Sequence, residues 1–295
     1  MLRTKLAGVE LRNPLILASG ILGDTGPSLK RAYEAGAGAV TTKSINATER
    51  EGHPNPIIVE YEHGLLNAVG LSSQPAEKFL NEIDAYSFPI IVSVQGRKPE
   101  DYVSVIKRLE QKAAIFELNL SCPNIEGIMP AGDPGEVKKI VSLASASTQK
   151  PVFVKLSPNV PDIASIAMAA ERAGADGITA INTVGPGMVI DIETKQPILS
   201  FKKGGVSGPA IRPVAVRCIY DIYEAVEIPI IGVGGVLTWA DAVEFVLAGA
   251  VGIGVGTAIM YSGLPIFKEI EQGLSAYLKK NKFSSLDELR GLAHE

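Results

Sequence analysis

Short apolar segments alternate with amphipathic stretches of helical length along the whole chain. This alternation is typical of βαβ units, in which a helix connects two parallel strands. The apolar segments contain few polar positions, and such runs indicate strands that are buried on both faces. The eight expected strands are residues 15–19, 39–45, 89–96, 115–122, 151–157, 177–183, 229–235 and 252–258.

A short sequence pattern recurs where an expected helix ends and the next strand begins. It reads EAGAGAV at 34–40, RAGADGI at 172–178 and LAGAVGI at 247–253. Glycine at such a point permits the left-handed conformation that ends many helices. Eight units in this order favour a closed α/β structure, the (β/α)8 TIM barrel, although periodicity alone leaves an open doubly wound sheet possible. Since such barrels commonly span about 250 residues, we expect residues 1–295 to form one domain.

The charged residues are balanced and dispersed, with 28 Lys and Arg against 32 Asp and Glu and no basic block. A nucleic-acid-binding protein would show a concentrated basic patch, so this class is disfavoured. The two cysteines, Cys122 and Cys218, fit no metal-binding spacing, and such sparse use suits a reducing compartment. Neither the first residues nor the apolar run near 248–260 resembles a signal peptide or a membrane span. We therefore expect a cytoplasmic protein without a metal site.

The connections between the expected elements differ in length, and the long ones follow the second, fourth and sixth strands. In a barrel these strand-to-helix loops form the catalytic face. Connections of this length are usually functional. Turn residues in the loop after the sixth strand suggest a small hairpin there.

Glycine-rich segments end the last two expected strands, GVGG at 232–235 and GVGT at 254–257. Without side chains, the backbone N–H groups can approach an anion, and barrels often bind a phosphate at this place. The alternative is that these glycines only permit tight packing. Neither segment matches the GxGxxG fingerprint of dinucleotide sites, so a mononucleotide is the better hypothesis.

Three further residues could carry chemistry. Cys122 ends the fourth strand within NLSCPN, where it could be a small buried hydrophobe or a catalytic thiol, and the spacing leaves both open. Lys43 and Lys155 each end an apolar strand, where a charge requires a ligand or a carboxylate. The alternative for both lysines is that the amine reaches solvent at the strand end. Cys218 lies on a helix face and is expected in the core.

Seven motifs together carry a resemblance to a known family. They are NAVGL at 67–71, NLSCPN at 119–124, VKLSPN at 154–159, INT at 181–183, GGVSGPA at 204–210, IIGVGG at 230–235 and VGTA at 255–258. In their order and spacing, over nearly the whole chain, they resemble the class 1B catalytic subunits of dihydroorotate dehydrogenase. The resemblance implies oxidation of (S)-dihydroorotate to orotate in pyrimidine biosynthesis. FMN would take the hydride, and Cys122 would be the general base that removes the neighbouring proton.

The resemblance also implies two sets of binding residues. Those expected to bind FMN are Ser19, Lys43, Ser44, Ser93, Asn119, Lys155, Ile181, Gly208, Gly234, Gly235, Gly256 and Thr257. Those expected to bind the pyrimidine are Lys43, Asn67, Ala68, Val69, Gly70, Leu71, Asn119, Asn182 and Thr183. Relatives often carry Asn where this chain has Ser93, so that contact would be weaker or mediated by water. The loop after Cys122 departs from the pattern of the bacterial enzymes, but its Gly and Pro content suits a lid.

Electrons must leave the flavin, and two distant cysteines cannot supply the four ligands of an ordinary iron–sulfur cluster. The resemblance therefore implies a separate electron-transfer subunit with FAD and a 2Fe–2S cluster, which reduces NAD+. It also implies a homodimer at the core of a heterotetramer. The alternatives are a class 1A enzyme that uses fumarate in the same site, or pyrimidine reduction of the dihydropyrimidine dehydrogenase type. A further alternative is a non-redox phosphate-binding barrel in which Lys155 acts as a base or Schiff-base residue.

Overall fold

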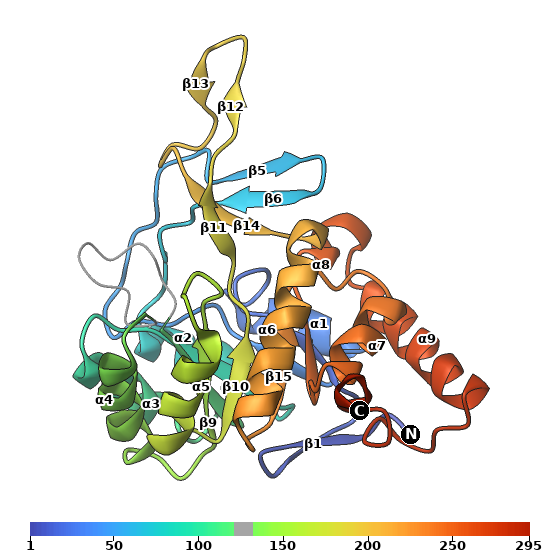
Figure 1. Cartoon of the computed structure of the whole chain (residues 1–295). Helices are drawn as coiled ribbons and strands as arrows, with labels where there is room; N and C mark the ends of the chain where they lie inside the picture. Colours follow the sequence, from blue (N-terminus) through green and yellow to red (C-terminus); the bar gives the residue numbers. More distant parts are fainter. Residues whose placement is uncertain (121–131) are drawn as a thin grey trace.

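Eight parallel strands close into a barrel in the computed structural model, which describes residues 1–120 and 132–295 (Figure 1). Sequential strands are neighbours around the ring, and β16 pairs with β3 to close it. This confirms the (β/α)8 barrel and excludes the open sheet. The barrel strands are β3 (Leu15–Leu17), β4 (Ala39–Thr41), β7 (Ile90–Val94), β8 (Ile115–Asn119), β9 (Val152–Leu156), β10 (Gly177–Ala180), β15 (Ile230–Val233) and β16 (Gly252–Val255).

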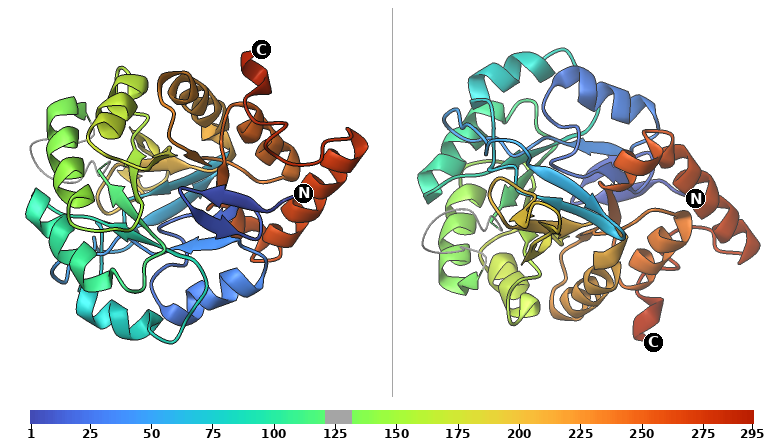
Figure 2. Two further views of the ribbon diagram at one scale, coloured as in Figure 1. Left: turned by 90° about the horizontal axis from the view of Figure 1, so that it is seen from below. Right: turned by 90° about the horizontal axis from the view of Figure 1, so that it is seen from above.

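Helices surround the barrel (Figure 2). Several begin at a side chain that accepts a backbone N–H of the first turn, among them Thr25, Asp133, Asp162 and Thr238. The helices are α1 (Gly26–Glu34), α2 (Ala76–Ile83), α3 (Pro99–Leu109), α4 (Pro134–Ser145), α5 (Ile163–Arg172), α6 (Arg212–Ala225), α7 (Trp239–Leu247), α8 (Ala258–Ser262) and α9 (Ile266–Lys280), with 3-10 turns η2 (Pro209–Ile211) and η3 (Leu292–His294). Among the described residues, no helix has the length and apolar character needed to cross a membrane.

Every expected strand is present, but each ends earlier than expected. The strand expected at 39–45, for example, ends at Thr41, and the Lys43 N–H donates to Gly23 O instead of to a neighbouring barrel strand. Residues beyond the strand ends keep a strand-like composition. Some still donate to a neighbouring barrel strand, such as the Ile45 N–H to Ser93 O at 2.9 Å, but the ladder is no longer continuous. Part of the range 115–122 lies outside the described residues.

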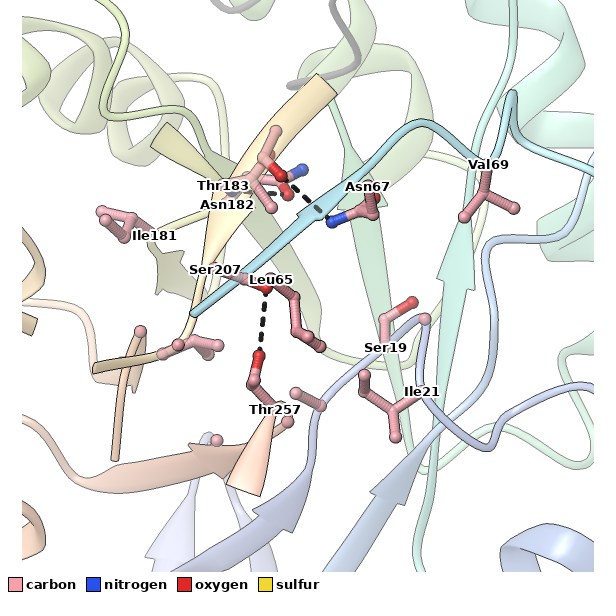
Figure 3. A pocket seen from close by; sticks show the side chains of 18 of the residues that line it. Ser19, Ile21, Leu65, Asn67, Val69, Ile181, Asn182, Thr183, Ser207 and Thr257 are labelled. Atoms are coloured by element: carbon pink, nitrogen blue, oxygen red, sulfur yellow. Dashed lines mark hydrogen bonds between the residues drawn. The ribbon is translucent and has the colours of Figure 1, made fainter. Parts of the chain in front are cut away.

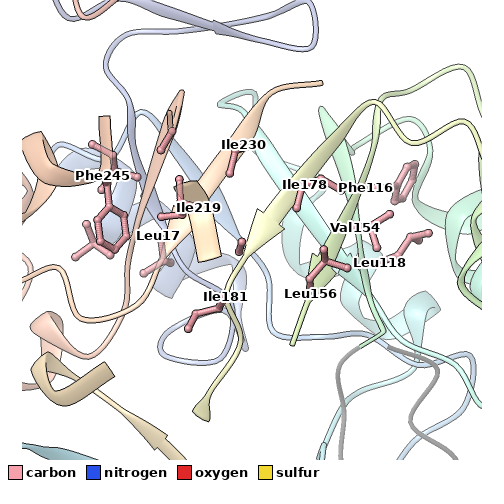
Figure 4. Close-up of a cluster of buried hydrophobic side chains, with 14 of the residues drawn as sticks. Leu17, Phe116, Leu118, Val154, Leu156, Ile178, Ile181, Ile219, Ile230 and Phe245 are labelled. Carbon is pink, nitrogen blue, oxygen red and sulfur yellow. The ribbon is translucent and has the colours of Figure 1, made fainter. Parts of the chain in front are cut away.

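Two large hydrophobic clusters form the core, one between strands and helices and one inside the barrel, and a third, small cluster joins Leu66 and Ala68 to Leu199. Alternation along β8 divides the two large clusters: Phe116 and Leu118 pack toward the helices (Figure 4), whereas Ile115 packs inside the barrel with Phe153. An unanticipated hairpin, β1 (Thr4–Leu6) with β2 (Val9–Leu11), adds leucines to the inner cluster and covers one end of the barrel (Figure 2). The other end is left for the site.

A small sheet lies over that other end (Figures 1 and 2). Two of its strands come from the loop after β4 and two from the loop after β10, in the order β11-β14-β6-β5. They are β5 (Ile58–Tyr61), β6 (Gly64–Asn67), β11 (Val184–Gly187) and β14 (Gly204–Ser207). The expected small hairpin, β12 (Ile190–Asp191) with β13 (Gln196–Pro197), projects from it. The two long loops thus pair with each other and cover the mouth of the barrel.

Candidate active site

A cavity of about 250 Å³ lies at the carboxyl ends of the barrel strands (Figure 3). Its walls come from the ends of β3, β4, β8, β9, β10, β15 and β16, and from the small sheet. In (β/α)8 enzymes this end of the barrel carries the active site. The fold therefore brings residues from most of the chain to one cavity.

The residues expected to bind cofactor and substrate meet in this cavity, with the exception of Ser93, and the expected base Cys122 cannot be placed. Ser93 is fully buried and does not line it; its Oγ lies 3.0 Å from Ser44 Oγ, behind the wall. Cys122 lies outside the described residues. The expected residues that line the cavity are Ser19, Lys43, Ser44, Asn67, Ala68, Val69, Gly70, Leu71, Asn119, Lys155, Ile181, Asn182, Thr183, Gly208, Gly234, Gly235, Gly256 and Thr257.

Lys43 joins the barrel to the segment that follows β6. Its Nζ donates to Ser72 Oγ at 2.8 Å and lies 3.6 Å from Asp24 Oδ2. The Lys43 side chain is 23% exposed, whereas that of Asp24 is 57% exposed, so solvent screens much of this ion pair. The ammonium group is thus held at the cavity wall by weak partners, and it remains available to a bound carboxylate.

Lys155 is more deeply placed, at 6% exposure, on β9. Within residues 1–120 and 132–295 its Nζ makes no hydrogen bond or ion pair, although Asn119 and Thr179 flank it on neighbouring strands. A buried ammonium group is costly unless it is paired. At this exposure the side chain does not extend into bulk water, so its amine faces the cavity. The cavity is built for a group that is anionic or rich in electrons at this point.

Side-chain amides from three segments are oriented by hydrogen bonds. Asn119 Nδ2 donates to Ser44 Oγ at 3.0 Å, and Asn67 Nδ2 donates to Gly205 O at 3.3 Å. Asn182 Oδ1 accepts the Thr183 N–H at 2.8 Å. Asn182 Nδ2 also donates to Asn119 Oδ1 at 3.5 Å. Because side-chain amides carry both donors and an acceptor, this polar wall suits a flat polar ring.

The segment 67–71 has an unusual backbone. Leu71 has φ +60° directly after Gly70 at φ +76°. A bulky residue rarely adopts this left-handed conformation, and such strain is concentrated at functional sites. Neighbouring groups hold the segment in place: the His53 N–H donates to Val69 O at 3.0 Å, and Arg50 Nε donates to Gly70 O at 3.1 Å.

The glycine-rich ends of β15 and β16 expose unpaired backbone donors. In the described part of the chain, no acceptor receives the N–H groups of Gly235, Val236, Gly256 or Thr257, although all four residues line the cavity. Thr257 Oγ1 lies 3.1 Å from Ser207 Oγ at the same edge (Figure 3). Such a group of free N–H donors suits a phosphate.

Packing explains only part of these glycines. A Cβ at Gly232 would lie 2.7 Å from side-chain carbons of Ile219 and Phe245, so packing requires glycine there. A Cβ at Gly256 would meet nothing closer than 3.5 Å, and the space it would fill borders the cavity. The residues therefore fit a phosphate-bearing cofactor at this edge and an electron-rich ring system beside Lys155.

We expect Gly235→Ala to destabilise the chain. Gly235 has φ +81°, and a Cβ there would lie 2.7 Å from Gly208 O and 2.9 Å from Arg212 Cβ. Backbone strain of this kind costs about 1–3 kcal/mol, which thermal and urea unfolding would detect. The control is Gly132→Ala, because a Cβ at Gly132 meets no atom of the described residues within 4 Å. Equal stability of the two variants would contradict the strain assigned to Gly235.

Cys218 is a core residue, as expected. It lies on α6 and is fully buried. Burial raises the pKa of its thiol, and the adjacent Arg217 offsets only part of this effect. A thiol with a raised pKa in apolar surroundings is chemically inert.

Several cavity residues were not expected. Most have apolar side chains and the others are Gly or Ser: Ala18, Gly20, Ile21, Ile58, Leu65, Ser72, Gly205, Ser207, Ile211, Val233, Val236, Gly254 and Met260. Gly205 and Ser207 lie within GGVSGPA, so the motif itself was a usable signal. Ile58 and Met260 belong to no motif, and only the pairing of distant segments brings them to the cavity.

Comparisons with known proteins agree with this geometry. A family model described as dihydroorotate dehydrogenase matches residues 1–278. Three similar proteins bear the name dihydroorotate dehydrogenase B (NAD(+)), catalytic subunit. That of Pyrococcus horikoshii is 50% identical over 99% of this chain and 98% of its own length. Those of Methanothermobacter thermautotrophicus (48%; 100% and 99%) and Methanosarcina mazei (47%; 98% and 94%) are similar over comparable spans.

Proposed function

The chain belongs to the dihydroorotate dehydrogenase family, and on this premise we propose that it oxidises (S)-dihydroorotate to orotate in pyrimidine biosynthesis. The observation that best supports this function is the buried Lys155, which has no partner among the described residues. It shares one cavity with backbone donors that no described group accepts and with amides oriented by hydrogen bonds. A flat substrate and a phosphate-bearing cofactor would use these groups together. Residues 1–295 would act as one cytoplasmic, FMN-binding domain.

FMN is the resident cofactor of this proposal, and the donor set fits it. The N–H groups of Gly235, Val236, Gly256 and Thr257 would hold the phosphate, and Lys155 would lie beside the ring. Bound FMN supplies the acceptor for the hydride that leaves the substrate. The protein positions that acceptor and tunes its electronics through the charge of Lys155.

The pyrimidine would be held by the amides of Asn67, Asn119 and Asn182, with its carboxylate near Lys43. The thiolate of Cys122 would then remove a proton from the ring carbon next to the one that loses hydride. One proton goes to sulfur and two electrons leave with the hydride, so a carbon–carbon double bond forms. Cys122 is therefore a general base and not a covalent nucleophile.

The electrons would pass to a separate subunit. The relatives' names contain both NAD(+) and catalytic subunit, which supports a division of labour between chains. We propose that FAD and a 2Fe–2S cluster reside on the electron-transfer partner, around a homodimer of this chain. Fumarate as acceptor, pyrimidine reduction and non-redox chemistry are less favoured by those names.

We expect the isolated chain to oxidise dihydroorotate with artificial dyes but hardly with NAD+, because no cofactor of this chain would reach the nicotinamide. A steady-state assay with dye, NAD+, fumarate and a quinone as acceptors, with and without copurifying proteins, measures this. Rapid NAD+ reduction by the isolated chain would contradict the partner. Preference for fumarate would place the chain with the class 1A enzymes.

A further inference from the structure

The turn after β15 has cavity-lining residues on one side and a buried carboxylate on the other. We name residues 234–238 the phosphate turn; Gly234, Gly235 and Val236 line the cavity. Asp241, in the first turn of α7, is 6% exposed and does not line the cavity. A carboxylate buried to this degree requires partners.

One oxygen of Asp241 holds the end of the phosphate turn. Oδ2 accepts the N–H groups of Leu237 at 2.9 Å and Thr238 at 2.8 Å. Thr238 Oγ1 in turn accepts the Asp241 N–H at 3.3 Å, which completes a capping box. The end of the turn is therefore fixed to helix α7.

The other oxygen of Asp241 reaches a different helix. Oδ1 forms an ion pair with Nη1 of Arg212, the first residue of α6, and Arg212 Nε lies 3.3 Å from Glu244 Oε2. Arg212 also packs directly behind the turn, because a Cβ at Gly235 would lie 2.9 Å from Arg212 Cβ. Both helices thus support the same short segment from outside the cavity.

We propose that Arg212 and Asp241 are a positioning pair that holds the phosphate turn in the shape that receives the FMN phosphate. This inference rests on the proposed function. The N–H groups of Gly235 and Val236 can bind phosphate well only if their directions are fixed before binding, since ordering a loose turn on binding weakens affinity. Strand β15 fixes one end of the turn, and Asp241 with Arg212 fixes the other.

A merely structural helix cap is the competing explanation, and the chain contains a control for it. Asp101, in the first turn of α3, accepts the corresponding backbone N–H groups: its Oδ2 accepts those of Arg97 at 2.9 Å and Lys98 at 3.3 Å. Asp101 does not line the cavity, and no arginine pairs with it in the part of the chain that the structure describes. Asp101→Asn therefore alters a cap without altering a positioning pair.

FMN and riboflavin separate the two explanations, because riboflavin has the same ring system and lacks the phosphate. Each flavin is titrated into the flavin-free full chain, and its fluorescence quenching gives the dissociation constant. In Asp241→Asn and Arg212→Gln, we expect FMN affinity to fall roughly tenfold or more, with riboflavin affinity changed less than about threefold. Asp101→Asn should leave the FMN to riboflavin ratio unchanged.

Arg212→Gln retains the hydrogen bonds of the α7 cap, so its ratio decides the matter if Asp241→Asn does not fold. Equal losses for the two flavins would overturn the positioning role, as would the same ratio change in Asp101→Asn. Failure of the unaltered chain to bind FMN would be a different result: it would refute the proposed function, and the pair would lose its role with it.

Discussion

Replacing Cys122 with alanine should reduce turnover with dihydroorotate by about 10²–10⁴-fold, the usual contribution of a general base. The variant should retain FMN, because the glycines proposed to hold its phosphate and Lys155 are unchanged. Stopped-flow reduction of the bound flavin by dihydroorotate, together with the flavin absorbance of the purified protein, measures both quantities. Normal reduction in this variant would refute the assignment of Cys122.

The second cysteine supplies the control for this experiment. Cys218 is buried on α6 with a raised thiol pKa, so Cys218→Ala should leave turnover intact and lower only stability.

The rate of the unaltered enzyme should also rise with pH as the thiol of Cys122 ionises, since a cysteine thiol has an ordinary pKa of about 8.5. A profile without this rise would point to a different proton acceptor.

The barrel could be predicted because its signal is local. The barrel strands are mostly apolar and buried, and β9, for example, has no exposed residue. The strand ends could not be located, because mouth residues such as Lys43 and Asn119 continue the pattern while their side chains turn to the cavity. Polar groups at a strand end thus belong to the site even where the composition still indicates a strand.

Pairings between distant segments were beyond the reach of local patterns. Gly205 pairs with Asn67 across the small sheet, and nothing in either segment indicates its partner. The hairpin β1–β2 was missed because three-residue strands carry little periodicity. Ser93 illustrates the same limit within the site: its strand was expected, but its position behind Ser44 depends on the closed barrel.

Motif resemblance named most cavity residues but not what supports them. Asp241 belongs to no quoted motif, and a helix-capping role would account for it from the sequence alone. Only the placement of its second oxygen on Arg212 connects it with the phosphate turn. This support depends on how side chains of helices α6 and α7 meet in space, and residue spacing along the chain does not reveal that.

Replacing Lys155 with methionine should lower the midpoint potential of bound FMN and slow its reduction. Methionine keeps much of the length of the buried side chain and removes the charge that would stabilise negative charge on the reduced cofactor. Unit charges about 4 Å apart at an effective dielectric constant of about 20 interact by about 4 kcal/mol, or roughly 90 mV for a two-electron couple. We therefore expect a decrease of several tens of millivolts, measured by dye-coupled reductive titration.

A surface lysine distinguishes local charge from net charge. Lys138 is exposed on α4 and does not line the cavity, so Lys138→Met makes the same change in formal charge outside the site. The midpoint potential of FMN bound to the Lys138→Met variant should match that of FMN bound to the unaltered protein, because solvent screens exposed charges. If both variants keep the original potential, Lys155 does not act on the ring, and its burial without a partner among the described residues would require another ligand.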